Sequence, residues 1–131
     1  MFFRGRRHRE LFMKEAAIHP KAGRRFTAAL YLLTADSKLW YQSRDQVTVR
    51  DIRVEAIRPK MLSPEAYLYW CAARDLLQGT QTVGLAELAD QGQKYPENFK
   101  VLVTALKICG GSWKADYQVR KRKEQSHGFQ R

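Results

Sequence analysis

The stretch from Ser63 to Gly79 constrains the fold more than any other part of the chain, because it carries start and stop signals for a single helix. Ser63 is a favoured N-cap residue, and Pro64 suits the first helical position, where its missing N–H costs nothing. Gly79 readily adopts the backbone conformation that follows a helix. These signals predict a helix over residues 64–78.

Apolar residues lie on both sides of this predicted helix. One side has the helical spacing of Ala66, Tyr69, Trp70, Ala73, Leu76 and Leu77. Leu68, Cys71 and Ala72 make the other side apolar too. Because a helix that is apolar all round is normally buried, we expect this one to be the central helix of the domain.

Other segments also show helical spacing or helix-start signals. They are residues 6–18, 22–34, a turn capped by Asp36 or Ser37, a short piece over 85–89, and 96–109 before Gly110 and Gly111. The second of these has a predicted core face of Phe26, Ala29, Leu30 and Leu33. Pro20 separates the first two, since the residue before a proline avoids helical geometry.

Residues 46–57 follow a different pattern, in which Val47, Val49, Ile52 and Val54 alternate with polar residues. A short strand pair near residues 47–57 and an extended loop both fit this alternation. The predicted fold is therefore mainly α, a compact bundle of about five helices. It is expected to span residues 3–113 as one domain, followed by a flexible basic tail over residues 114–131, where apolar periodicity is lost.

Positive charge is concentrated in the first and last segments of the sequence. The chain has 24 Lys and Arg against 13 Asp and Glu, a formal net charge of +11. Residues 1–25 hold eight cations and two acids, and residues 114–131 hold six and two. The residues between them hold ten cations and nine acids. This distribution predicts two basic patches on a nearly neutral body, suited to a polyanionic partner.

Several classes of protein are disfavoured by the sequence. No apolar run approaches the length of a membrane span, and Met1 to Arg7 lacks the order of a secretory signal. We therefore expect a cytoplasmic protein with no membrane partner. Cys71 and Cys109 fall within apolar helical patterns, which favours buried free thiols over a disulfide or a reactive site.

No catalytic, metal or cofactor motif is recognised. Residues 79–84 lack the Lys and Ser/Thr of a phosphate loop. His8 and His19 would lie about 16 Å apart on a continuous helix, too far to share a metal. Asp51 and Glu55 are interpreted as solvated surface rather than as a nuclease pair. A serine or cysteine nucleophile with a distant histidine stays open, so a small enzyme of unknown type remains an alternative.

Candidate anion-binding residues stand beside the predicted start of the second helix. Lys21, Arg24 and Arg25 lie where the helix dipole already presents positive charge, which is locally unfavourable. A bound phosphate would reverse the sign by accepting hydrogen bonds from free N–H groups and neutralising the cations. The alternative is that these side chains bend into water or pair with acids from elsewhere in the fold.

Cations near the two ends of the sequence are also candidates for phosphate binding. Candidate binding residues there are Arg4, Arg6, Arg7 and Arg9 near the start, and Arg120, Lys121, Arg122 and Lys123 near the end. Guanidinium groups suit bidentate phosphate contacts, and Trp113, Tyr117 and Phe129 could stack on bases. A solvated tail that only improves solubility is the competing interpretation.

A loose helix-turn-helix pattern gives a DNA-binding regulatory module as another alternative. It would comprise residues 85–89 and 96–108, with a connecting gap of six residues where three or four are usual. Base readers on the second helix would be Asn98, Lys100, Thr104 and Lys107. Helix packing is the favoured role for both segments.

One further pattern is an order of mostly apolar positions across residues 3–109. It consists of Phe3, His8, Leu11, Phe12, Ala29, Leu30, Tyr31, Leu32, Leu33, Leu39, Trp40, Asn98, Phe99, Ala105, Leu106, Lys107 and Ile108. This order resembles that of small uncharacterised proteins from phages and integrated mobile elements of Gram-positive gut bacteria. The resemblance implies a DNA binder or a stoichiometric inhibitor of host defence, of the anti-CRISPR kind.

Charge and resemblance together predict a non-enzymatic binder of nucleic acid or of a nucleic-acid-bound protein. An inhibitor of a nucleic-acid-guided host nuclease is the specific form expected.

Overall fold

The structure is a computed structural model that describes residues 1–111. Six α-helices form a compact bundle over these residues: α1 Arg6–Ile18, α2 Arg24–Leu33, α3 Ser37–Ser43, α4 Pro64–Gln78, α5 Leu85–Lys94 and α6 Pro96–Cys109. Two short 3₁₀ turns, η1 Arg44–Gln46 and η2 Val54–Ala56, lie between α3 and α4. The predicted mainly α class is confirmed.

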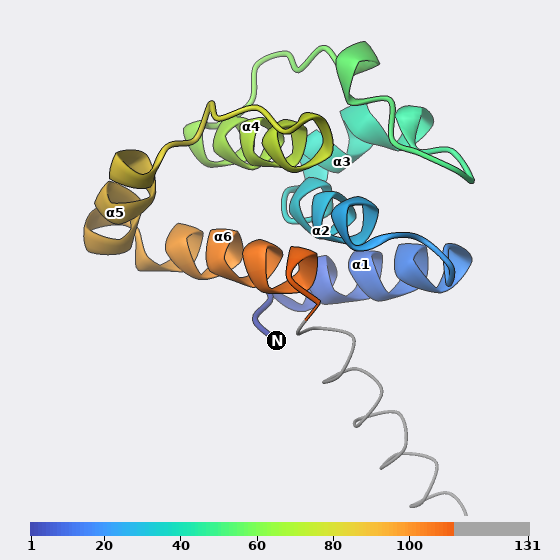
Figure 1. The fold of residues 1–131 in the computed structure, drawn as a ribbon, viewed down its shortest axis with the longest axis horizontal. Coiled ribbons are helices and arrows are strands. Elements are labelled where there is room, and N and C mark those ends of the chain that lie inside the picture. The colour runs from blue at the N-terminus through green and yellow to red at the C-terminus, as the bar shows by residue number, and fades with distance from the viewer. Residues whose placement is uncertain (112–131) are drawn as a thin grey trace, which may run out of the picture.

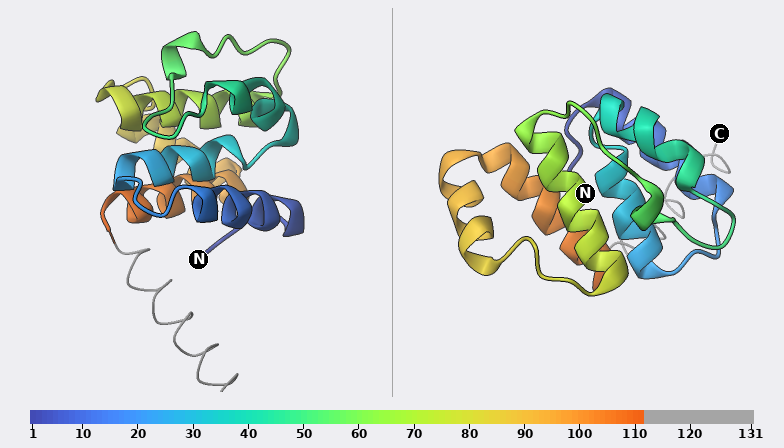
Figure 2. Two further views of the ribbon diagram at one scale, coloured as in Figure 1. Left: turned by 90° about the vertical axis from the view of Figure 1, so that its right-hand side faces the viewer. Right: turned by 90° about the horizontal axis from the view of Figure 1, so that it is seen from above.

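Helix α2 lies in the middle of three layers. Figure 1 shows α3 and α4 above it and α1 and α6 below it, with α5 at one end joining α4 to α6. The side view in Figure 2 shows the same order of layers. Contacts from α2 to α1, α3, α4 and α6 make it the helix around which the bundle packs.

The prediction that residues 64–78 form the central helix is therefore wrong. Eight of the ten residues of α2 are buried, from Phe26 to Leu33, and not only the predicted stripe of four. In α4 the buried residues end at Ala73, and Leu76 and Leu77 are half-buried. The sequence signal for burial was the unbroken apolar run of residues 28–33, which has no polar face to expose.

Helix ends follow their local signals closely. The Ser63 hydroxyl accepts a hydrogen bond from the backbone N–H of Ala66 at 3.2 Å, and Pro64 opens α4. Gly79 ends it in the left-handed region at φ 72°. Asp36 caps α3 by accepting from the N–H of Leu39 at 3.0 Å. The predicted caps of α3 and α4 are confirmed.

The longest departure from the predicted element bounds is in α5. The segment expected to be helical only over residues 85–89 continues to Lys94, and Tyr95 alone separates it from α6. The six-residue gap assumed for a helix-turn-helix is thus mostly helix. Asn98 and Thr104, two of the four proposed base readers, are buried.

The alternating segment after α3 is a tight loop. Within residues 1–111 no strand is present, and the only pairing there is an isolated antiparallel bridge between Val47 and Ile52. The Thr48 hydroxyl accepts from the N–H of Asp51 at 3.0 Å and donates to its carboxylate at 2.7 Å. Such side-chain bonds to the nearby backbone compete with strand pairing and favour a turn.

Residues 1–3 pack against the bundle. Phe3 lies in a cluster of rings with His8, Phe12 and Tyr31, at centroid distances of 5.2–6.0 Å. The Tyr31 hydroxyl donates to the Phe2 carbonyl at 2.6 Å. The first residues thus belong to the domain, and the tail predicted over residues 114–131 lies outside the described residues.

Candidate anion-binding surface

Arg4 serves the fold. Its guanidinium donates to the Ala35 carbonyl at 3.2 Å, lies 3.9 Å from the Asp36 carboxylate, and sits 5.4 Å from the centre of the Tyr69 ring. Its backbone N–H donates to His8. These contacts fix the start of the chain to the connection between α2 and α3 and to α4, so the Arg4 guanidinium is engaged within the fold.

The three arginines on the first turns of α1 do not share one face: Arg6 and Arg9, three residues apart, lie on the same side, and Arg7 lies elsewhere around the helix. Arg6 pairs with Glu10 one turn along the exposed face, at 2.9 Å. Arg7 donates to the Ser37 hydroxyl at 3.3 Å and remains exposed. Arg9 is exposed about 200° around the helix from Arg7, at about 100° per residue. They therefore do not form one basic patch.

Arg24, predicted to be unfavourable at the start of α2, is stabilised by a contact with another helix. Its guanidinium donates to the Gly110 carbonyl at 3.3 Å, at the end of α6. The negative end of one helix dipole thus receives a cation that would be unfavourable at the positive end of its own helix. The expected alternative of pairing elsewhere in the fold holds for this residue, although its partner is a carbonyl and not an acid.

Lys21 and Arg25 are both exposed and form no ion pair among residues 1–111. Between them, Gly23 is the N-cap of α2 and supplies no side-chain cap. The N–H groups of the first turn therefore have no side-chain acceptor, and Lys21 and Arg25 flank Gly23 in the sequence. Uncapped N–H groups at the positive end of a helix are suited to binding a phosphate. We call Lys21, Gly23 and Arg25 the α2 corner.

Gly111, the last described residue, lies beside Arg24, next to this corner. Gly111 follows the carbonyl that Arg24 contacts, and a Cβ placed on Gly111 would lie 2.9 Å from the Arg24 guanidinium. The four predicted binding residues Arg120, Lys121, Arg122 and Lys123 lie outside the described residues.

A cleft of about 770 Å³ was not predicted from the sequence. Its walls are α1 on one side and residues 40–49 of α3, η1 and the following turn on the other. Its lining comprises Arg7, Leu11, Lys14, Glu15, Ile18, His19, Trp40, Arg44, Asp45, Val47, Thr48 and Val49. We call it the α1–η1 cleft. The available sequence signal was the spacing of Arg7, Leu11, Lys14 and Ile18, which places them on one flank of a helix.

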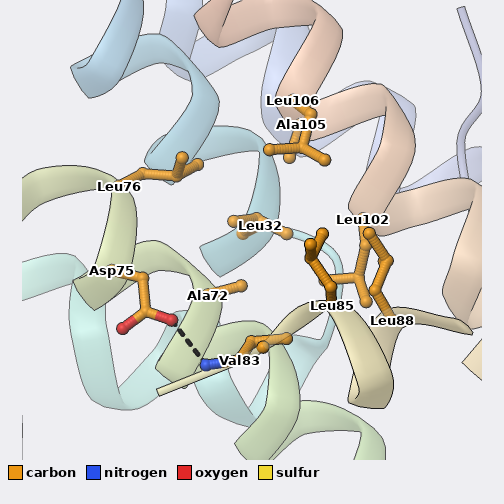
Figure 3. Close-up of a pocket in the computed structure, with 11 residues that line it drawn as sticks. Leu32, Ala72, Asp75, Leu76, Val83, Leu85, Leu88, Leu102, Ala105 and Leu106 are labelled. Carbon is orange, nitrogen blue, oxygen red and sulfur yellow. Dashed lines mark hydrogen bonds between the residues drawn. The ribbon is translucent and has the colours of Figure 1, made fainter. Parts of the chain in front are cut away.

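A second hollow, of about 160 Å³, is almost wholly apolar. Figure 3 shows leucines from α2, α4, α5 and α6 turned toward it. Its one charged lining residue, Asp75, accepts hydrogen bonds from the N–H groups of Thr82 and Val83 at 3.0 and 2.7 Å and from the Thr80 hydroxyl. These bonds occupy the carboxylate with the α4–α5 loop, so the hollow offers no free polar group to orient a ligand.

His8 and Cys71 are titratable residues buried in the described part of the chain. His8 is buried, with its Nδ1 and Nε2 both bonded to backbone. Cys71 and Cys109 are free, and burial raises the pKa of the Cys71 thiol, which keeps it protonated. Among residues 1–111, no three His, Cys, Asp or Glu side chains gather as a metal site would require.

No helix within residues 1–111 is long and apolar enough to cross a membrane. Comparison with protein-family models, curated proteins and solved structures gives no match for this chain.

Proposed function

We propose that the protein is a non-enzymatic binder of nucleic acid or of a nucleic-acid-bound protein, with the α2 corner contacting phosphate. The observation that carries this proposal is an uncapped helix N-terminus between two exposed cations, Lys21 and Arg25, neither of which pairs with an acid among residues 1–111. Phosphate supplies both the hydrogen-bond acceptors and the negative charge that this arrangement lacks.

The charge of the whole chain supports the same partner. A formal net charge of +11 favours association with polyanions at long range. On the resemblance to phage and mobile-element proteins, the specific form proposed is a stoichiometric inhibitor of a nucleic-acid-guided host nuclease. Such a partner acts in the cytoplasm, and we assign the protein to that compartment on this ground.

The proposal is tested by measuring binding to a fluorescein-labelled DNA duplex of about 20 base pairs. Affinity should fall steeply between 50 and 200 mM salt, with a log–log slope of about −0.9 for each phosphate neutralised. The double variant Lys21→Glu/Arg25→Glu should bind on the order of tenfold more weakly at about 100 mM salt, because two phosphate contacts become repulsive.

The matched control is Arg53→Glu/Arg58→Glu, which makes the same change in net charge at two exposed positions of the η2 region. This control should lose much less affinity than the corner variant. Equal losses in the two variants would mean that the corner is not a site and that only total charge matters. Capture of partners from host lysate, with and without nuclease treatment, then decides whether nucleic acid or protein is the primary ligand.

A further inference from the structure

The α1–η1 cleft has the chemistry of a protein-docking surface rather than of a phosphate groove. Its cations are Arg7, Lys14 and Arg44, but Glu15 and Asp45 line it too. Within residues 1–111 neither of these acids forms an ion pair, so both would face an occupant uncompensated. A phosphate backbone following this cleft would meet two carboxylates, whereas a polypeptide can offer both signs of charge.

Exposed apolar side chains at the cleft also favour a protein partner. Ile18 and Val49, which line it from α1 and from the turn after η1, are 60% and 88% exposed. Scattered apolar residues are normal on a surface, but two beside one cleft form a patch that another apolar side chain would cover. Two rings belong to the lining. Trp40 is only 8% exposed, so its ring is not available for stacking on a base, and the ring of His19 already packs on Phe26, with centroids 4.9 Å apart.

The dimensions of the cleft limit what can occupy it. Along α1 it extends from Arg7 to Ile18, about 16 Å at 1.5 Å per residue. That length matches about five residues of extended chain at 3.3 Å each. Arg7 and Lys14 stand two helical turns apart on one wall, about 10 Å along the axis, and Arg44 lies on the other wall.

From this charge and shape we propose that the α1–η1 cleft docks a short segment of a protein partner. The segment carries acidic side chains about 10 Å apart for Arg7 and Lys14, a basic side chain for Glu15 or Asp45, and at least one apolar side chain between Ile18 and Val49. The inference rests on the proposed function in one respect, since it supplies the protein contact of a nucleic-acid-bound partner. The α2 corner would then contact the nucleic acid of the same assembly.

A library of random peptides of about 12 residues displayed on phage tests this inference with the full chain as bait. Selected peptides should combine two or more Asp or Glu with apolar residues and at least one Lys or Arg. Synthetic copies, labelled and followed by fluorescence anisotropy, should bind the variant Ile18→Ser/Val49→Ser on the order of tenfold more weakly, because two apolar side chains no longer cover the peptide. The separate variant Lys14→Glu should also weaken the binding of the acidic peptides, because it replaces an attractive charge by a repulsive one.

The control is Met61→Ser/Leu85→Ser, which removes two apolar side chains that are 89% and 86% exposed outside the cleft. It should leave peptide affinity unchanged. Failure to select any peptide, selection of peptides without acids, or equal loss in both variants would overturn the inference. So would loss of single-stranded DNA binding in the Ile18/Val49 variant, because nucleic acid would then be the occupant.

Separate variants test the phosphate contact at the α2 corner and the peptide contact at the α1–η1 cleft, so either proposal can be wrong without the other. Lys21→Glu/Arg25→Glu should retain peptide binding, and Ile18→Ser/Val49→Ser should retain binding to the duplex. If the full chain binds peptides but shows no salt-dependent DNA binding, the proposed function falls and the docking cleft stands.

Discussion

His8 is held in the core by two hydrogen bonds to backbone groups. Its Nε2 lies 2.8 Å from the Tyr31 carbonyl, and its Nδ1 accepts from the N–H of Arg4 at 3.1 Å. Only the neutral ring with its proton on Nε2 satisfies both bonds. Burial lowers the pKa of His8 to about 4, with a smaller contribution from the Arg4 charge, although the bond to Tyr31 opposes this shift.

This histidine should make stability depend on pH. In the unfolded chain its pKa is near 6.5, so between pH 6.5 and 4 the unfolded state binds the extra proton. The stability that depends on the neutral ring is complete above pH 6.5 and is lost as the pH falls to about 4, a loss of about 3 kcal/mol. Urea unfolding of the wild type at about pH 8 and about pH 4.5 measures it.

The control for this measurement is His8→Gln, which cannot titrate. It should be less stable than the wild type at about pH 8 and should lose less stability on acidification. If both proteins lose the same free energy of unfolding, other groups cause the pH dependence and His8 is not responsible.

At the scale of elements, Asp75 joins the last turns of α4 to the loop that leads into α5. Burial alone would raise its pKa, but hydrogen bonds from Thr80, Val83 and Thr82 outweigh burial and lower it. The lowered pKa shows that these bonds favour the charged carboxylate. Because the rest of α5 packs mainly on α6, this loop is the chief connection between α5 and α4.

Asp75→Ala should therefore destabilise the fold by about 1–2 kcal/mol, because several loop donors lose their acceptor at once. Hydrogen exchange should quicken at the amides of Thr82 and Val83, which donate to this carboxylate. Asp90→Ala is the matched control, since Asp90 makes only an exposed ion pair with Lys94 on α5. Its effect should stay within about 0.5 kcal/mol. Equal effects would mean that Asp75 does not organise the loop.

At the scale of the whole molecule, the cations of the first 25 residues fall into groups with different surroundings. Arg4, Arg6 and Arg24 are engaged by an acid or a carbonyl within the fold. Lys21 and Arg25 stand free at the α2 corner, while Arg7 lines the α1–η1 cleft. Residues 114–131 add a further six cations and two acids. Only part of the sequence-level basic excess is thus available to a partner on the described surface.

The contribution of the last segment can be measured in the full chain. Replacing Arg120, Lys121, Arg122 and Lys123 together by Gln should reduce the log–log salt slope of duplex binding by up to about 3.6, or about 0.9 for each phosphate that is no longer neutralised. The control replaces four exposed cations of the η2 region, Arg50, Arg53, Arg58 and Lys60, by Gln. An unchanged slope in the first variant would show that these residues do not bind DNA.

The sequence predicted the helical class, the start of α3 and both ends of α4. Those features depend on local chemistry, namely a cap oxygen within reach of a nearby N–H, a proline in the first turn, and a glycine where the backbone turns left-handed. It also indicated the start of α2 beside Lys21 and Arg25, because helix ends are governed by the residues around them.

Which helix is central, which cations remain free and where the cleft lies depend on how the helices pack together. Arg24 meets Gly110, which is 86 positions away in the sequence. Arg7 and Arg44 line one cleft from helices that are adjacent only after folding. Spacing along the chain reports which residues share one helix face, but the partner of that face depends on how the helices pack, and packing is a property of the whole bundle.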